Sequence, residues 1–280
     1  MRKNLYDILQ DMKLNVPREY STLYDLFVVE RSVYTGRHFS LADVIDANYF
    51  RSMSLRETFT SVKSMMEALD LRETASDIDK LFLFCEFLLS LLMSKELKNV
   101  TAADFNTQSD TIIRNILRIV EKCNHELKNL SEDEDEYKII IVEKNKSATL
   151  AAEIVDDTAV SIDLITYNHY ALKGNLAEKK KILTAIGSYI EPILKSRALD
   201  KAGYKQLESD TGFVLNCFHI RHNNKTGAKE QEYIKTLSDT ELEKWYDRAY
   251  DMMIAVILIN EHIPAQEEIK ELKGKYTWRM

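Results

Sequence analysis

The stretch LFLFCEFLLSLLM, residues 81–93, decides the fold class of this chain. Its polar positions, Glu86 and Ser90, are four residues apart and therefore lie on one face of a helix. The stretch is shorter than the ~20 residues that a helix needs to cross a bilayer, as is the apolar run at residues 252–259. We therefore expect both runs to be helices in a protein core, with no membrane partner.

Apolar residues recur at helical spacing along most of the chain, for example through residues 112–127 and 182–194. The exception is YKIIIV, residues 137–142, a short β-branched run that is typical of a strand. A strand needs a partner, and the sequence does not indicate which segment provides it. The chain is thus predicted to be mainly α, built from helical bundles, with one short strand or hairpin near residues 137–143.

An acidic run at residues 132–136 separates the two halves of the chain. Because five consecutive like charges cannot be buried, we interpret this run as an exposed linker and place a domain boundary there. The prediction is an N-terminal helical domain of unknown type at residues 1–131 and a second helical bundle at residues 137–280.

Composition and charge exclude several classes of protein. The 280 residues are 45% hydrophobic and 30% charged, which is ordinary for a globular protein, and the net charge of −7 argues against general nucleic-acid binding. The sequence carries no metal-binding motif, phosphate loop or nucleophile elbow, so we predict no metal and no cofactor. Three widely spaced cysteines and the lack of a signal-like N-terminal run favour the cytoplasm.

The segment FHIRHNN, residues 218–224, is the densest group of chemically capable side chains. We expect a helix from about Tyr204 to His222, which would place Arg221 on the same apolar stripe as Val214 and Phe218. A charge on an apolar stripe needs a partner or a water-lined cleft, because an isolated buried charge is too costly. Asn223 and Asn224 are good helix terminators.

These features resemble the HEPN superfamily, and more narrowly the HEPN-like domains of bacterial abortive-infection and toxin systems. The resemblance rests on Asn168-His169, on the capped Lys179–Lys181 helix, on the Arg-His-Asn-Asn helix end at residues 221–224, and on the long closing helix. It covers roughly residues 137–262. It implies a bundle of four or five helices that often dimerises and, in many members, cleaves RNA without a metal.

The resemblance also implies site residues. Arg221 matches the motif's arginine and His222 its polar position, whereas residues 226–228, where the motif has histidine, are Thr, Gly and Ala. Either His222 or His219 substitutes as the base that accepts the 2′-hydroxyl proton, or the chain is a non-catalytic member. The candidate catalytic residues are Arg221, His222 and His219, and the possible accessory residues are Asn168, His169, Asn223 and Asn224.

Two functions stay open. The first is an RNA-targeting HEPN-like protein in phage defence or a toxin system, with RNA as its partner; a modest basic excess at residues 175–201, six basic against three acidic residues, favours it. The second is a non-catalytic helical interaction module that forms a homodimer and binds a protein through its N-terminal half. The second function predicts an internal ion pair for Arg221 and an exposed apolar patch elsewhere.

Overall fold

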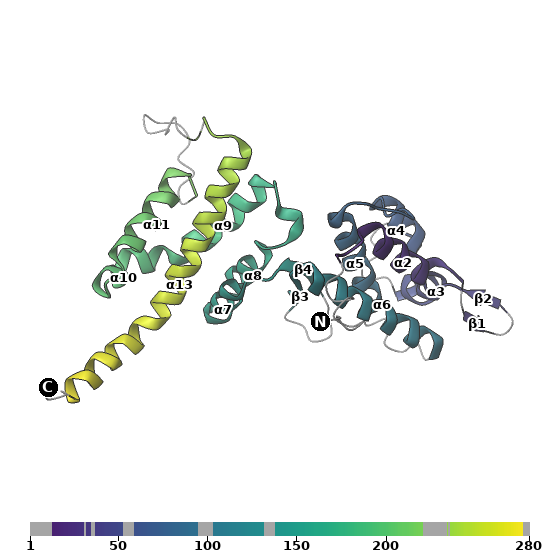
Figure 1. Ribbon diagram of the computed structural model, residues 1–280, viewed down its shortest axis with the longest axis horizontal. Coiled ribbons are helices and arrows are strands. Elements are labelled where there is room, and N and C mark those ends of the chain that lie inside the picture. The colour runs from purple at the N-terminus through teal and green to yellow at the C-terminus, as the bar shows by residue number, and fades with distance from the viewer. Residues whose placement is uncertain are drawn as a thin grey trace, which may run out of the picture. The chain divides into compact units, whose positions relative to one another are not determined.

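The computed structural model describes residues 13–30, 32–34, 37–52, 59–94, 103–131, 138–220, 234 and 236–276. Over these residues the chain is mainly α-helical, which confirms the predicted fold class (Figure 1). The chain divides into two compact units, unit 1 at Met1–Lys144 and unit 2 at Asn145–Met280. The acidic run at residues 132–136 and the strand's first residue, Tyr137, lie outside the described residues.

Unit 1 contains helices and two short hairpins. Its elements are α2 (Val16–Val28), β1 (Ser32–Tyr34), β2 (Arg37–Phe39), α3 (Leu41–Ser52), α4 (Val62–Ala68), α5 (Ile78–Leu92), α6 (Ala103–Lys122), β3 (His125–Asn129) and β4 (Ile139–Glu143). The apolar run that begins at Leu81 forms most of α5, whose N-terminus is capped by the Asp77 carboxylate. Its residues are buried on nearly all sides, so α5 is the central helix of this unit.

Glu86, one of the two polar positions in the apolar run of α5, binds the main chain of the sheet. Its Oε1 accepts a hydrogen bond from the Ile141 N–H of β4 at 2.6 Å. In the β3–β4 pair, Ile141 lies opposite Leu127, and its N–H points away from β3. The glutamate therefore satisfies a donor on the open edge of the strand, which a sheet edge otherwise leaves unpaired.

The predicted strand at residues 137–143 has β3 as its antiparallel partner, with His125 opposite Glu143 and Asn129 opposite Ile139. Leu127, which the helical stripe at residues 112–127 included, is a strand residue. Helix α6 ends at Lys122, and Asn124 turns the chain with a left-handed φ of 58°. Because the strand pairs back onto unit 1, the unit boundary follows the hairpin rather than the acidic run. The β1–β2 hairpin was not predicted.

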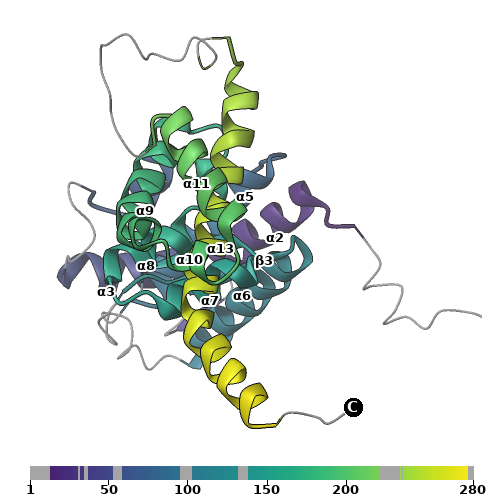
Figure 2. The same ribbon diagram turned by 90° about the vertical axis from the view of Figure 1, so that its left-hand side faces the viewer.

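Unit 2 is a helical bundle. Its elements are α7 (Lys146–Ile154), α8 (Thr158–Thr166), the 3₁₀ helix η2 (Tyr170–Leu172), α9 (Leu176–Ser196), α10 (Ala198–Lys201), α11 (Lys205–Cys217) and α13 (Asp239–Lys275). Helices α7, α9 and α11 pack against the long helix α13, as Figure 2 shows from the end of the unit. Local sequence fixes two helix starts: Asn175 caps α9, and Ser238 with Glu241 forms the capping box of α13.

The core of unit 2 lies between α9 and the middle of α13. Ile182, Ile186 and Ile190 of α9 are buried there, as are Met253 and Ile257 of α13. Beyond Ile263 the side chains of α13 leave this core. Among the described residues, no helix combines the length and the apolar character that a membrane span requires.

Candidate functional site

A lysine is buried at the junction of α9 and α13 in unit 2. Lys179, in the first turn of α9, is 7% exposed. Its Nζ lies 2.7 Å from Asp247 Oδ1 and 2.8 Å from Glu243 Oε1, and both carboxylates belong to α13. Tyr167, which follows α8, donates its hydroxyl to the same Asp247 oxygen at 2.9 Å. We call Lys179, Glu243, Asp247 and Tyr167 the Lys179 cluster.

The Lys179 cluster is tied to the chain around it. Besides its contact with Lys179, Glu243 Oε1 accepts a hydrogen bond from the Gly174 N–H at 2.7 Å. Gly174 has a φ of +76°, a conformation that a side chain would strain, so the turn between η2 and α9 favours glycine there. The Lys179 ammonium also lies 5.2 Å from the centre of the Tyr167 ring, within reach of a cation–π contact. Together these contacts join α8, α9 and α13.

Burial and hydrogen bonding shift the pKa values of Tyr167 and Glu243 in this cluster. Burial raises the pKa of Tyr167, and the neighbouring Asp247 raises it further, so the phenol stays neutral. Burial alone opposes ionisation of Glu243, yet the hydrogen bonds from Lys179 and Gly174 lower the pKa of Glu243 on balance. Tyr167 therefore stays a protonated hydrogen-bond donor, and Glu243 stays an ionised acceptor.

A second polar network adjoins the cluster through stacked tyrosine rings. The rings of Tyr167 and Tyr250 are 4.1 Å apart at 17°. The Tyr250 hydroxyl donates to the Leu164 carbonyl and accepts from Asn168 Nδ2 at 2.6 Å. Asn145, which caps α7, donates to Asn168 Oδ1 at 3.4 Å. Burial raises the pKa of Tyr250, which keeps its hydroxyl available as the donor.

The chemistry open to these groups is limited by how completely they bind one another. A general base or nucleophile needs an accessible group whose pKa is near neutrality. Here the lysine is held by two carboxylates, and both tyrosines are kept protonated by burial. The Lys179 cluster is therefore suited to fixing the positions of α8, α9 and α13, and less to proton transfer.

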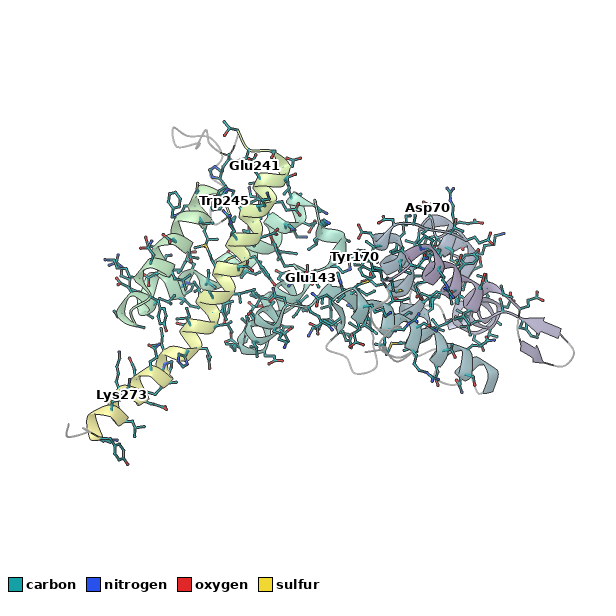
Figure 3. All side chains as sticks on the ribbon, viewed as in Figure 1. Asp70, Glu143, Tyr170, Glu241, Trp245 and Lys273 are labelled. Carbon is teal, nitrogen blue, oxygen red and sulfur yellow. The ribbon has the colours of Figure 1, made fainter. Side chains whose placement is uncertain are left out.

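Asn168 is the predicted accessory residue whose surroundings are clearest, and its role is to connect α7, α8 and α13 through Asn145 and Tyr250. His169 precedes η2, is half-buried, and its ring lies 4.4 Å from the ring of Tyr170, which Figure 3 labels. Neither residue is a member of the Lys179 cluster, although both follow Tyr167 directly in sequence.

The expected helix from Tyr204 to His222 is shorter in the structure. Helix α11 ends at Cys217, and His219 adopts a left-handed φ of 52°. The Ile220 N–H bonds to the Leu215 carbonyl at 3.0 Å and the His219 N–H to Asn216 at 3.3 Å, the pattern of a Schellman motif. The helix that was expected to carry Arg221 therefore ends at Cys217, and Arg221 itself lies outside the described residues.

His219 is the candidate catalytic residue whose position is described, and it is half-buried at the turn that ends α11. Next to it, Phe218 stacks on Trp245 with ring centres 4.9 Å apart, and the Arg248 guanidinium lies 4.7 Å from the same indole (Figure 3 labels Trp245). The other candidates, Arg221, His222, Asn223 and Asn224, lie outside the described residues.

The members of the Lys179 cluster were not predicted, although the sequence holds a partial signal. Lys179 precedes Ile182, Leu183 and Ile186 by three, four and seven residues, so it belongs to their buried stripe. Asp247 precedes Tyr250 and Ile254 by three and seven residues, which places it near the buried face of α13. Periodicity thus marks both charges as partly buried, but only the packing of α9 on α13 pairs them.

The comparisons with known proteins give no family for this chain. No family model matches it, and searches of curated proteins and of solved structures found no match. Within the described residues, no group of three or more His, Cys, Asp or Glu side chains is placed to hold a metal ion.

Proposed function

We propose that the chain is a non-catalytic α-helical interaction protein that self-associates through the C-terminal end of α13. One observation carries this proposal. Ile269 and Leu272 are 45% and 53% exposed and lie three residues apart on one side of α13, and Tyr276, four residues further at the C-cap of the helix, is 68% exposed. Figures 1 and 2 show this end of α13 extending past the other helices of unit 2.

A second copy of the same helix end is the occupant that the pattern favours. If Ile269 and Tyr276 are a positions and Leu272 is a d position, Glu268 is a g position and Lys273 an e position. In a parallel pair, a g residue faces the e′ residue five positions later. Glu268 of one chain then faces Lys273 of the other, and two-fold symmetry repeats this attractive pair.

The expected association is weak. Three apolar positions per chain provide far less contact than a coiled coil of three or four heptads, so we expect a Kd of ~100 μM, which corresponds to about −5.5 kcal/mol. Near this Kd, a twofold change in protein concentration changes the fraction of dimer. The association can therefore be measured in the native chain.

Sedimentation equilibrium of the full chain at concentrations from micromolar to millimolar tests the proposal. We expect the average mass to rise with concentration, and the double variant Ile269→Lys/Leu272→Lys to stay monomeric. The matched control is Glu267→Gln/Glu271→Gln, which makes the same change of net charge at positions f and c, outside the pairing face, and should associate as the native chain does. A native chain that stays monomeric at every concentration contradicts the proposal.

The contacts within unit 2 support the non-catalytic part of the proposal. The Lys179 cluster has its ammonium, carboxylates and phenol bonded to one another, and the Asn168 network uses the Tyr250 hydroxyl as both donor and acceptor. Groups held in this way stabilise a scaffold.

The alternative proposal is an RNA-targeting HEPN-like protein of phage defence or a toxin system. It is supported by the helical bundle that the described residues of unit 2 form and by the half-buried imidazole of His219 at the end of α11. The test is cleavage of a mixed RNA substrate without added metal, with Arg221→Ala and His219→Ala as variants. Cleavage by the native chain that both variants lack would favour this alternative over the interaction protein.

The location that we propose is the cytoplasm. Cys85 and Cys123 are free thiols, and Cys217 is buried at the end of α11. Burial raises the pKa of each of them, which keeps the thiols protonated and unreactive. Free thiols of this kind fit a reducing compartment.

A further inference from the structure

Unit 1 contains a groove of about 710 Å³ between α2, α3, α4 and the connection that leads to α5. Its apolar lining comes from Tyr24 and Val28 of α2, Val62 and Met66 of α4, and Leu71. Val62, Met66 and Leu71 are almost fully buried and form the floor, whereas Tyr24 and Val28 are half-buried at the sides. A cavity of this size with an apolar floor is typical of a binding site.

Two exposed apolar residues are sequence neighbours of residues that line the groove. Val29, next to Val28 at the end of α2, is 44% exposed, and Leu69, at the end of α4, is 38% exposed. Both are adjacent in sequence to lining residues. The floor also contains a methionine, whose flexible thioether adapts to differently shaped apolar partners.

The polar lining of the groove is acidic. It contains the carboxylates of Asp43, Asp46, Glu67, Asp70 and Glu73. The cations Lys63 and Arg72 also line it, and Lys80 pairs with Asp70 at 3.1 Å, so five negative groups against three positive ones leave an excess of two negative charges. Figure 3 labels Asp70 among these side chains of unit 1.

Main-chain donors hold two of the carboxylates in place. Asp46 Oδ1 accepts the Val62 N–H at 2.6 Å, and Asp43 Oδ2 accepts the Ser40 N–H at 2.8 Å. An N–H group is a dipole without net charge, so both carboxylates keep their negative charge while they stay fixed in position. A cationic ligand would thus meet acceptors that are already oriented.

We infer that this groove binds an amphipathic helix of a partner protein, with leucine-like side chains on one face and lysine or arginine residues along its flanks. The apolar face covers the floor around Met66, and the cations pair with the acidic rim, which is the helix-in-groove mode of recognition. Nucleic acids and other polyanions are repelled by the same rim. This inference is independent of self-association, because it concerns unit 1 and α13 belongs to unit 2.

A synthetic probe tests the inference on the full chain. The probe is a fluorescein-labelled 18-residue Leu/Lys helix with all its leucines on one face, and fluorescence anisotropy reports binding. A peptide of the same composition with scrambled order keeps the charge but lacks the apolar face. We expect the amphipathic probe to bind at least tenfold more tightly than the scrambled one, and its affinity to fall as NaCl is raised. Equal binding of the two peptides overturns the inference.

Charge reversal locates the site. We expect Glu67→Lys/Glu73→Lys to weaken probe binding at least tenfold, because these exposed side chains belong to the rim. The matched control is Asp110→Lys/Glu121→Lys, the same charge change at exposed positions of α6 outside the groove. An equal loss in this control would mean that the probe binds the acidic protein nonspecifically, and would overturn the inference.

Methyl NMR tests the floor directly. In a chain labelled at the methionine methyl groups, the Met66 signal, assigned with Met66→Leu, should shift as the amphipathic probe is added. An unchanged Met66 signal at saturating probe contradicts the inference. Repeating the titration in Ile269→Lys/Leu272→Lys separates the two proposals, since probe binding should persist in that variant whether or not the native chain self-associates.

Discussion

The two units stabilise their partly buried carboxylates in different ways. In unit 2, Glu243 and Asp247 share the buried ammonium of Lys179. In unit 1, Glu86 and Asp46 instead accept main-chain N–H groups, from Ile141 and Val62. An ammonium cancels the charge and closes the site, whereas an N–H group fixes a carboxylate and leaves its charge in place. This difference is why we assign a structural role to the Lys179 cluster and a binding role to the groove of unit 1.

The largest expected effect is the loss of the internal cation. We expect Lys179→Met to destabilise the protein by about 2 kcal/mol, because two carboxylates lose their shared donor; Asp247 is half-exposed, so water limits the loss. Thermal or urea unfolding measures this change. Lys181→Met, at an exposed position of the same helix, is the control and should change stability by less than about 0.5 kcal/mol. Equal effects of the two substitutions on stability would contradict a stabilising role for the internal ion pair.

The edge of β4 gives the next largest effect. Glu86→Leu suits an apolar helix but leaves the Ile141 N–H without its acceptor, so we expect a loss of about 1–2 kcal/mol. Glu86→Gln keeps an acceptor oxygen and should lose less than half as much. Urea unfolding of both variants distinguishes the hydrogen bond from simple packing, since a packing role predicts that leucine is the better replacement.

The smallest effect is a pH dependence of opposite sign in the two units. Because the folded pKa of Glu243 lies below its usual value of 4.5, its contribution to stability is present above pH 4.5 and is lost as the pH falls through the folded pKa. The destabilisation by Glu243→Gln should therefore shrink below pH 4.5. Burial raises the pKa of Asp46 above its usual 3.8, against the opposing effect of the Val62 N–H.

For Asp46, ionisation costs stability in the folded state, so the native chain loses stability as the pH rises from below 3.8 through the folded pKa. As the pH rises over this range, the Asp46→Asn variant should gain stability relative to the native chain. Urea unfolding at several pH values between 3 and 6 gives both trends. Trends of the same sign in the two variants would contradict the contrast between the units.

Local sequence signals were sufficient for much of the fold. The apolar run from Leu81 predicts α5, and the Ser238–Glu241 pair predicts the start of α13, because both depend on contacts within one helix. Strand β3 was not predictable in this way. In HELKN the apolar residue is Leu127, and its place in the sheet depends on pairing with β4.

The candidate site was harder to predict than the fold. The end of α11 lacks a glycine, and His219 takes the left-handed position that glycine usually fills, so no residue before Arg221 indicates the end of the helix. Lys179 and Asp247 are far apart in sequence and are paired by the packing of α9 on α13. The groove likewise requires three helices whose arrangement no local pattern specifies.

Cysteine cross-linking tests self-association through α13 most directly. In a chain that carries Cys123→Ser and retains the buried Cys85 and Cys217, Leu272→Cys places a thiol at the proposed d position, and Glu271→Cys places one on the outer face. We predict that mild oxidation of the Leu272→Cys chain at ~100 μM, the expected Kd, forms a disulfide-linked dimer at least tenfold faster than oxidation of the Glu271→Cys chain. Equal rates for the two positions would contradict parallel pairing of the α13 ends.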